Sequence, residues 1–307
     1  MAEDQIDDQE MLEIIEPIHD GLCVPFLGAG ANFTGAGYQG LRLGYEVAQE
    51  LAQTIQAQSP VSDAKNLARV SLQLERIRSR PFLIRRMKEL LPDEQRTPSP
   101  LIQVLAELPF NLYITTNYDR LLEKALENRN RKVVVQTCEE LIGKPDLEDW
   151  AAKPAEERSP LVYKIHGTFC TQEFQKPDAS SVIVTEDDYI ELLTMLGPEA
   201  KGIPNLITGK IQISTILFLG YSLEDWDFRA IYKGLIERTA NKFPPKSFAI
   251  QKNPSPFWKD FWSRKGVIIK NVDIYDFARD LKKAYFKRYP GPQNGGRPTG
   301  GQIAAGS

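Results

Sequence analysis

Cysteine and histidine are scarce in this 307-residue chain, which has three cysteines and two histidines. Cys23, Cys138 and Cys170 are scattered, odd in number and without a C-x-x-C pair. This spacing excludes a structural zinc site with the usual cysteine ligands. We therefore expect no bound metal, and the cysteine count fits a reducing, cytoplasmic compartment.

The sequence also lacks a large excess of charge of either sign and a long apolar run. Its 38 basic and 41 acidic residues leave a net charge of -3, which gives no general attraction to nucleic acid or to an anionic membrane. No apolar run is long enough to span a bilayer. Residues 1–16 are acidic and lack the basic and apolar regions of a secretory signal. We expect neither nucleic acid nor a membrane as a direct partner.

Apolar segments of strand length alternate with segments of helical periodicity. Strands are predicted at residues 22–27, 112–116, 132–137, 161–167, 215–220, 246–250 and 266–270. Helices include 7–20, 119–128 and 276–287. This alternation predicts an α/β fold with a doubly wound, mostly parallel, Rossmann-like sheet.

The strand signal disappears over about 41–108, where helical periodicity predicts an insertion between the first and second strands. This insertion belongs to a single expected domain of residues 1–289. Its basic run, 76–88, is interpreted either as a contact for a partner or a phosphate, or as a solvated helix face balanced by acids. Residues 290–307 have the Gly/Pro composition of a flexible tail or linker, which suits a fused sensing module and equally an exposed tail.

The first predicted strand runs into the turn Gly28-Ala29-Gly30-Ala31-Asn32. A strand, a glycine turn and a helix in this order hold a pyrophosphate on backbone N–H groups. The dinucleotide fingerprint needs a third glycine where this chain has Phe33, which weakens a dehydrogenase interpretation. The alternative is a tight turn in which glycine supplies a positive φ.

Polar groups and one histidine follow three later strands. The segments are Asn117-Tyr118-Asp119, His166-Gly167 and Gly220-Tyr221-Ser222. Because the carboxyl ends of parallel strands share one edge, where open α/β sheets bind ligands, these residues are expected to meet the glycine turn. One base and one amide without a Ser or Cys nucleophile suit attack by water, or by another oxygen, on a nucleotide held by its phosphates. Plainer interpretations remain: a hydrogen-bonding strand-end His166, a left-handed turn residue at Asn117 and a helix N-cap at Asp119.

Four ordered motifs resemble the sirtuin-like domain of bacterial antiphage defence proteins, over residues 20–285. They are Gly-Ala-Gly-x-Asn, Thr-Thr-Asn-Tyr-Asp, Lys-Ile-His-Gly-Thr and Phe-Leu-Gly-Tyr-Ser-Leu-x-Asp-x-Asp. The resemblance implies a domain that cleaves the nicotinamide–ribose bond of NAD. It implies that His166 is the general base, that Asn117 contacts the nicotinamide ribose or positions water, and that Ser222 holds the adenosine side. The NAD-binding set is then Gly28, Ala29, Gly30, Asn32, Asp119, Gly220 and Ser222.

The chain departs from protein-deacylating sirtuins, because it has neither their four-cysteine zinc module nor their Gly-Ile-Pro-Asp-Phe-Arg loop. This favours NAD hydrolysis, with water as the acceptor. Such an enzyme would drain cellular NAD, so we expect gating by self-association, by a sensor or activator protein, or by a fused C-terminal domain. The alternatives are an NAD- or ADP-ribose-sensing module without turnover, a deacylase, and an oligomerisation scaffold.

Overall fold

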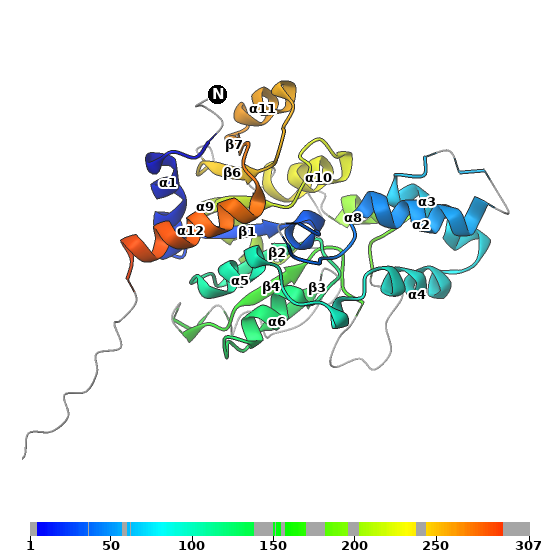
Figure 1. The fold of residues 1–307 in the computed structure, drawn as a ribbon, viewed down its shortest axis with the longest axis horizontal. Helices are drawn as coiled ribbons and strands as arrows, with labels where there is room; N and C mark the ends of the chain where they lie inside the picture. Colours follow the sequence, from blue (N-terminus) through cyan, green and yellow to red (C-terminus); the bar gives the residue numbers. More distant parts are fainter. Residues whose placement is uncertain are drawn as a thin grey trace, which may run out of the picture.

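The computed structural model describes residues 5–35, 37–56, 60–61, 63–137, 150, 152–154, 157–169, 182–195, 203–237 and 244–290. Cys138, Cys170 and the predicted tail beyond residue 290 lie outside this set. In the part of the chain described, seven parallel strands form one sheet in the order β3-β4-β2-β1-β5-β6-β7 (Figure 1). The strands are β1 Cys23–Leu27, β2 Leu112–Thr115, β3 Val134–Thr137, β4 Leu161–Lys164, β5 Thr215–Leu219, β6 Ser247–Ile250 and β7 Val267–Lys270. The predicted doubly wound parallel sheet is confirmed.

The sheet has an apolar core on each face, because consecutive strand residues point to opposite sides. Tyr113 and Leu217 belong to one core, whereas Ile114 and Phe218 belong to the other. The first core is covered by α1 (Asp8–His19), α5 (Pro100–Glu107), α6 (Leu121–Glu127) and α12 (Ile274–Arg288). The second is covered by α8 (Glu186–Met195), α9 (Asn205–Ile213), α10 (Trp226–Ile231), the π-helical segment Tyr232–Glu237 and α11 (Pro256–Ser263). Burial on both faces explains why the strands are continuous apolar runs.

Capping residues in the sequence fix where several of these helices begin. Asp7 and Glu10 form a capping box at the start of α1. The side chains of Ser99 and Asp273 accept backbone N–H groups at the starts of α5 and α12. The Thr185 hydroxyl accepts the Asp188 N–H and the Asp188 carboxylate accepts the Thr185 N–H, which caps the start of α8.

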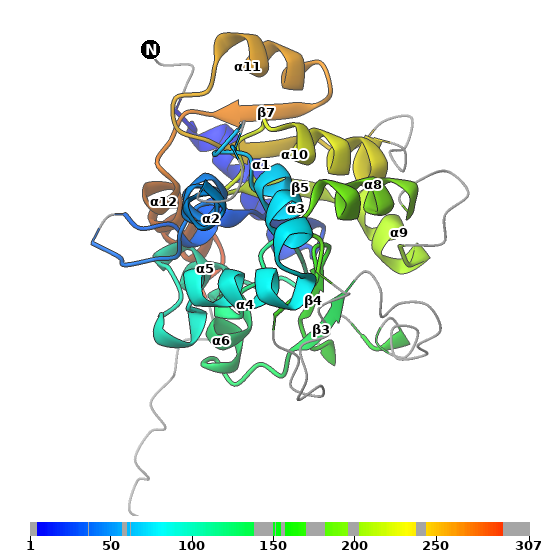
Figure 2. The ribbon, with the colours of Figure 1, turned by 90° about the vertical axis from the view of Figure 1, so that its right-hand side faces the viewer.

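A separate helical lobe lies to one side of the sheet (Figure 1), in front of the strands in Figure 2. It consists of α2 (Gly44–Gln56), α3 (Leu67–Ile77) and α4 (Arg80–Leu90), which share a core with Phe169, Val182 and Val184. Helix α5, at the end of the predicted insertion, instead packs on the sheet with α6 and α12. The range 41–108 therefore contains both an added lobe and an ordinary helix of the flanking layer.

Ion pairs join the lobe to α8. They are Arg69 with Glu186 (3.0 Å), Arg76 with Asp187 (3.0 Å) and Arg80 with Asp188 (2.8 Å). The Arg80 side chain is only 18% exposed and also pairs with Glu75, whereas Arg76 is 74% exposed. The pairs of Arg76 and Arg80 balance part of the basic run with acids. The half-buried pair of Arg80 contributes most to stability, because exposed ion pairs contribute little.

The turns that follow β1 and β5 pack against each other, backbone to backbone. The Gly30 N–H donates to the Gly220 carbonyl at 2.9 Å. A Cβ added to Gly30 would lie 2.9 Å from the Gly220 Cα, and one added to Gly220 would lie 2.1 Å from the Ala31 nitrogen. Gly220 has a φ of +78°, but Gly28 has a φ of -108° and Gly30 is not among the glycines with positive φ. The first glycine turn thus needs glycine for close approach, and the alternative of a positive φ there is wrong.

Replacing Gly220 by alanine tests this contact, with Gly266→Ala as a matched control. Gly266 has nearly the same φ, +77°, but a Cβ there would meet nothing within 4 Å. We expect Gly266→Ala to lower the free energy of unfolding by about 1–2 kcal/mol, from backbone strain alone. Gly220→Ala adds an overlap with backbone atoms and should cost at least about 2 kcal/mol more. Urea denaturation measures both variants, and equal losses would contradict a tight contact between the two turns.

Candidate active site

A cavity of about 760 Å³ opens at the carboxyl edge of the sheet, between the strand ends and the lobe. Seven of the nine predicted site residues line it: Ala29, Gly30, Asn117, Asp119, His166, Gly220 and Ser222. The lobe and its connections contribute Tyr45, Lys65 and Leu67, among others. The strand order places this cavity at the switch point between β1 and β5, where α/β sheets bind ligands.

The other two predicted residues, Gly28 and Asn32, do not line the cavity but support it. The Gly28 carbonyl accepts the Asn117 Nδ2–H group at 3.0 Å. Asn32 is 2% exposed, and its Nδ2 donates to the Asp119 Oδ1 at 3.3 Å. Its Oδ1 accepts the Ser99 N–H at 3.4 Å. Asn32 therefore connects the glycine turn to the Asp119 carboxylate and to the start of α5.

Backbone N–H groups of the glycine turn are engaged inside the protein. Gly28 donates to the Leu219 carbonyl, Gly30 to Gly220 and Ala31 to Gly28, each at 2.9 Å. These three groups do not face a ligand, so a pyrophosphate bound here needs other donors. The cations that line the cavity are Arg42, Lys65 and Lys252.

His166 combines burial with an unpaired acceptor. Its side chain lies just beyond β4 and is 5% exposed. Tyr189 packs perpendicular to the imidazole, with ring centroids 5.1 Å apart. Burial lowers the pKa of His166 to about 3, although the Asp188 charge and a hydrogen bond to the Thr116 backbone oppose this shift. Nε2 has no hydrogen-bond partner among the residues described. The ring is therefore neutral and keeps Nε2 as an acceptor, since the other nitrogen makes the bond to Thr116.

The Asn117 amide is held on the floor of the cavity. Its Nδ2 is bonded to the Gly28 carbonyl, and its backbone N–H donates to the Thr115 Oγ1 at 3.0 Å. The non-glycine residues with positive φ in the described chain are Asn130 and Asn253, so the left-handed turn interpretation of Asn117 is wrong. An amide fixed in this way is suited to orienting a ligand oxygen.

Asp119 is partly buried at the start of α6. Its Oδ1 accepts the Leu121 N–H at 2.9 Å, so the carboxylate also satisfies a helix N-terminal donor. Burial raises the pKa of Asp119 to about 6, against the opposing effect of the Lys164 charge. This carboxyl group gains or loses its proton close to physiological pH.

Aromatic residues form a wall of the cavity that sequence reasoning missed. The wall contains Tyr118, Tyr189, Tyr221 and Trp226. The Tyr221 hydroxyl donates to the Leu27 carbonyl at 2.9 Å, and Tyr189 packs on Trp226 with ring centroids 5.4 Å apart. Tyr189 also donates a hydrogen bond to Asp227. Tyr221 and Trp226 follow the late glycine strand closely, which is a usable sequence signal, whereas nothing in the periodicity of α8 singles out Tyr189.

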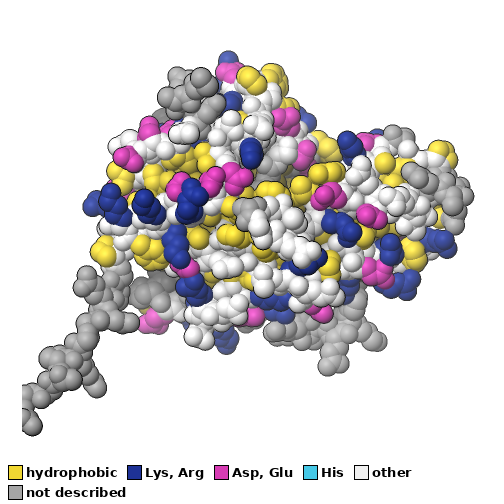
Figure 3. All heavy atoms as spheres, in the orientation of Figure 1, with side chains coloured by type: hydrophobic (Ala, Val, Ile, Leu, Met, Phe, Trp, Pro, Cys, Tyr) yellow, Lys and Arg dark blue, Asp and Glu magenta, His cyan; other side chains and the backbone are white. Residues whose placement is uncertain are grey.

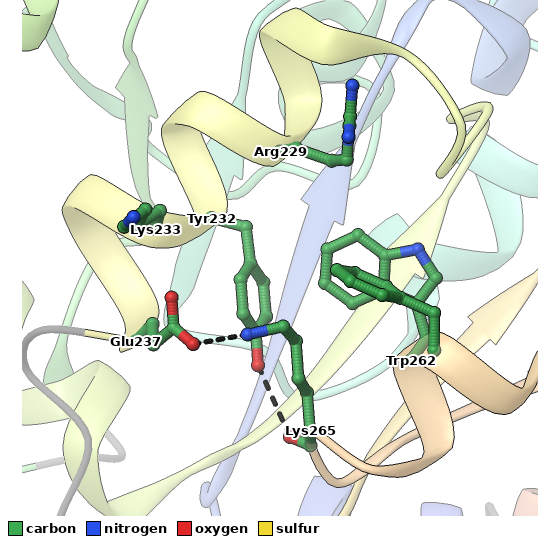
Figure 4. Close-up of a pocket in the computed structure, with 7 residues that line it drawn as sticks. Arg229, Tyr232, Lys233, Glu237, Trp262 and Lys265 are labelled. Atoms are coloured by element: carbon green, nitrogen blue, oxygen red, sulfur yellow. Dashed lines mark hydrogen bonds and ion pairs between the residues drawn. The ribbon is translucent and has the colours of Figure 1, made fainter. Parts of the chain in front are cut away.

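A second, smaller concavity of about 480 Å³ lies between the segment after α10 and α11 (Figure 4). Lys265 forms an ion pair with Glu237, and its carbonyl accepts the Tyr232 hydroxyl at 3.3 Å. This second concavity contains none of the predicted site residues. We therefore place the candidate active site in the larger cavity.

Charged side chains of both signs lie on the surface of the molecule. Figure 3 shows basic and acidic side chains interspersed over one face of the molecule. Within the described residues, no three or more His, Cys, Asp and Glu side chains are grouped to hold a metal ion. No described helix has the length and apolar composition of a membrane span.

The low pKa of His166 predicts how the stability of the folded state changes with pH. The unfolded chain takes up a proton near pH 6.5, whereas the folded protein does so only near pH 3, so the folded state loses stability as pH falls through this window. At pH 5 this loss amounts to about 2 kcal/mol. We expect wild type to lose about this much more than His166→Gln when urea denaturation at pH 5 is compared with pH 8.

The comparison between the two proteins cancels other titrating groups. Burial raises the pKa values of Asp119 and Asp225 to about 6 each, which makes the folded state more stable as pH falls. Both carboxyl groups are present in wild type and in the variant. Parallel pH profiles for the two proteins would show that His166 takes up its proton normally in the folded state.

Comparison with known proteins finds a family model and several related proteins. A family model for the SIR2-like domain matches residues 111–269. The "NAD(+) hydrolase ThsA" of Acinetobacter baumannii is 33% identical over 143 residues, which are 46% of this chain and 26% of that protein. The "NAD(+) hydrolase ThsA" of Cytobacillus dafuensis is 27% identical over 231 residues, 73% of this chain and 40% of that protein. The "Defense-associated sirtuin 2" of Bacillus subtilis is 25% identical over 280 residues, 90% of this chain and 25% of that protein.

The chain thus spans about a quarter to two fifths of the length of these relatives. The matched range 111–269 covers more than half of the chain and includes Asn117, His166, Gly220 and Ser222. The order of strands, the residues at their carboxyl ends and this match lead to one conclusion, that the chain belongs to the SIR2-like domain family.

Proposed function

We propose that this domain hydrolyses the nicotinamide–ribose bond of NAD⁺ and releases nicotinamide and ADP-ribose. The observation that carries the proposal is the neutral, buried His166 with an unpaired Nε2, which lines the same cavity as the fixed Asn117 amide. A cavity of about 760 Å³ lies within the usual range for small-molecule and cofactor sites.

The chemistry needs an oxygen acceptor and little acid assistance. The nicotinamide ring of NAD⁺ is cationic, so it leaves as a neutral molecule when the C–N bond breaks, and the bonding electron pair goes with it. The ribose left behind has oxocarbenium character, and a water oxygen forms the new bond to its anomeric carbon. The proton of that water passes to the His166 Nε2 and then to solvent. A pKa near 3 makes His166 a weak base, but the positive charge on the ribose makes the attacking water more acidic.

Asn117 contributes orientation. Its amide is fixed by the Gly28 carbonyl, and it lines the cavity with His166. Holding the attacking water or a ribose hydroxyl in place lowers the entropic part of the barrier. The cations Arg42, Lys65 and Lys252, which line the same cavity, are our candidates for contacts to the pyrophosphate.

The relatives support both the reaction and its biological setting. Two of the proteins described above are named as NAD(+) hydrolases and one as a defence-associated sirtuin. We extend NAD⁺ as the substrate and a role in antiphage defence to this chain on that basis. Gating by self-association or by a sensor or activator protein stays a prediction.

We expect His166→Ala to lower nicotinamide release from NAD⁺ by about 10²- to 10⁴-fold, because it removes the proton acceptor. His19→Ala is the matched control. The His19 ring stacks on the Tyr289 ring, with ring centroids 3.8 Å apart, and it does not line the cavity. The assay is nicotinamide release under conditions in which wild type turns over, with the melting temperature measured alongside. Near wild-type activity in a folded His166→Ala protein would rule out a role for His166 as proton acceptor. A wild type that binds NAD⁺ but releases no nicotinamide, at any concentration, would favour a sensing module.

We expect Asn117→Ala to reduce turnover more than affinity, because orientation of the attacking oxygen acts mainly in the transition state. A fall in kcat of about 100-fold, with the Kd for NAD⁺ changed by less than about threefold, is the expected pattern. Calorimetric titration gives the Kd, and steady-state nicotinamide release gives kcat. Loss of NAD⁺ binding by a folded variant would instead make Asn117 a simple ligand contact.

A further inference from the structure

A buried lysine connects the ends of the two strands that carry Asn117 and His166. Lys164 is the last residue of β4, and its side chain is 1% exposed. Its Nζ lies 3.0 Å from the Oε1 of Glu123, whose side chain is 2% exposed. Nζ also donates to the Asn117 carbonyl at 3.4 Å and, at closer range, to the Asp119 carbonyl.

The three partners of Lys164 all lie in one short segment, residues 117–123. An ammonium group has three N–H donors and no acceptor, so these contacts use its full capacity. The segment begins just after β2, whose Thr115 pairs with Lys164 in the sheet, and it runs into α6. One cation therefore holds the connection between β2 and α6 from the neighbouring strand.

Stability alone does not account for this arrangement. Lysine is rarely fully buried unless it is paired, and a buried ion pair is often no more stable than apolar residues of similar size. The Glu123 Oε2 moreover has no hydrogen-bond partner among the residues described, so the pair is not fully compensated. What an apolar pair could not do is fix the direction of the Asn117 and Asp119 carbonyls.

We propose that Lys164 is a positioning residue, which sets the Asn117–Asp119 backbone and through it the Asn117 amide relative to His166. Lys164 precedes His166 by two residues at the end of the same strand. Its bond to the Asn117 carbonyl therefore fixes the position of Asn117 relative to His166. The role of the two groups in turnover rests on the proposed NAD⁺ hydrolysis. The ordering of the loop does not depend on it.

The experiment compares Lys164→Met with the double variant Lys164→Met/Glu123→Leu. Lys164→Met leaves a buried, unpaired carboxylate and should lower the melting temperature strongly. The double variant removes that carboxylate and should regain much of the lost stability. Its kcat for nicotinamide release should nevertheless stay about 100-fold below wild type, with KM nearly unchanged, because the loop carbonyls have lost their donor.

Lys270→Met is the matched control. Lys270 also ends a parallel strand, is 5% exposed and pairs with Glu10 at 2.5 Å, but it does not line the cavity. We expect a lower melting temperature and wild-type kcat from this variant. A double variant at Lys164 and Glu123 that recovered both stability and kcat would overturn the proposal, since Lys164 would then only neutralise Glu123.

Hydrogen–deuterium exchange separates this inference from the proposed activity. The Asn117 N–H is bonded to the Thr115 Oγ1 and the Leu121 N–H to the Asp119 Oδ1, so both amides report on the order of the loop. Exchange at residues 117–121 should be faster in both Lys164 variants and unchanged in Lys270→Met. If wild type released no nicotinamide, the activity proposal would fail while exchange still tested the positioning role. Exchange at residues 117–121 that is unchanged in the double variant would contradict the positioning role of Lys164.

Discussion

The backbone contact between the turns after β1 and β5 is the constraint on which the site depends. At this point the chain passes from one half of the sheet to the other, and the two turns form the floor of the cavity. Gly28, Gly30 and Gly220 allow the turns to approach to a distance that any side chain would prevent. The same contact uses the N–H groups of Gly28 and Gly30, whereas the Ala31 N–H is bonded to the Gly28 carbonyl within the first turn. The glycine turn is therefore a joint between two strands as much as a surface for an anion.

Much of the fold and of the site can be predicted from this sequence because both follow from the parallel sheet. Strands buried on two faces are apolar runs, and the polar residue that ends each run lies at the ligand-binding edge. This is why Asn117, His166 and Ser222 are found in one cavity despite their separation in the chain. The same reasoning identifies a helical insertion, since periodicity marks helices regardless of where they pack.

The remaining features depend on contacts that no local pattern contains. Lys164 reads as one more residue of a strand until its side chain is seen to reach Glu123. The perpendicular packing of Tyr189 on His166 brings together α8 and β4 across a segment outside the described residues. The spacing of the glycines likewise does not show why glycine is needed in the first turn, because close approach and a positive φ require the same residue type. Only the neighbouring turn decides between them.

The ion pairs between the lobe and α8 have a consequence for the exchange of segments between related chains. Arg69, Arg76 and Arg80 find their partners 117, 111 and 108 residues further along the chain. The order of the three arginines matches the order of the three acids, so the two segments carry complementary halves of one charge pattern. A recombination event that separated them would join a lobe to a helix with unmatched charges. The contact between the lobe and α8 therefore depends on both segments at once, and a change of charge in either one leaves its partner unmatched.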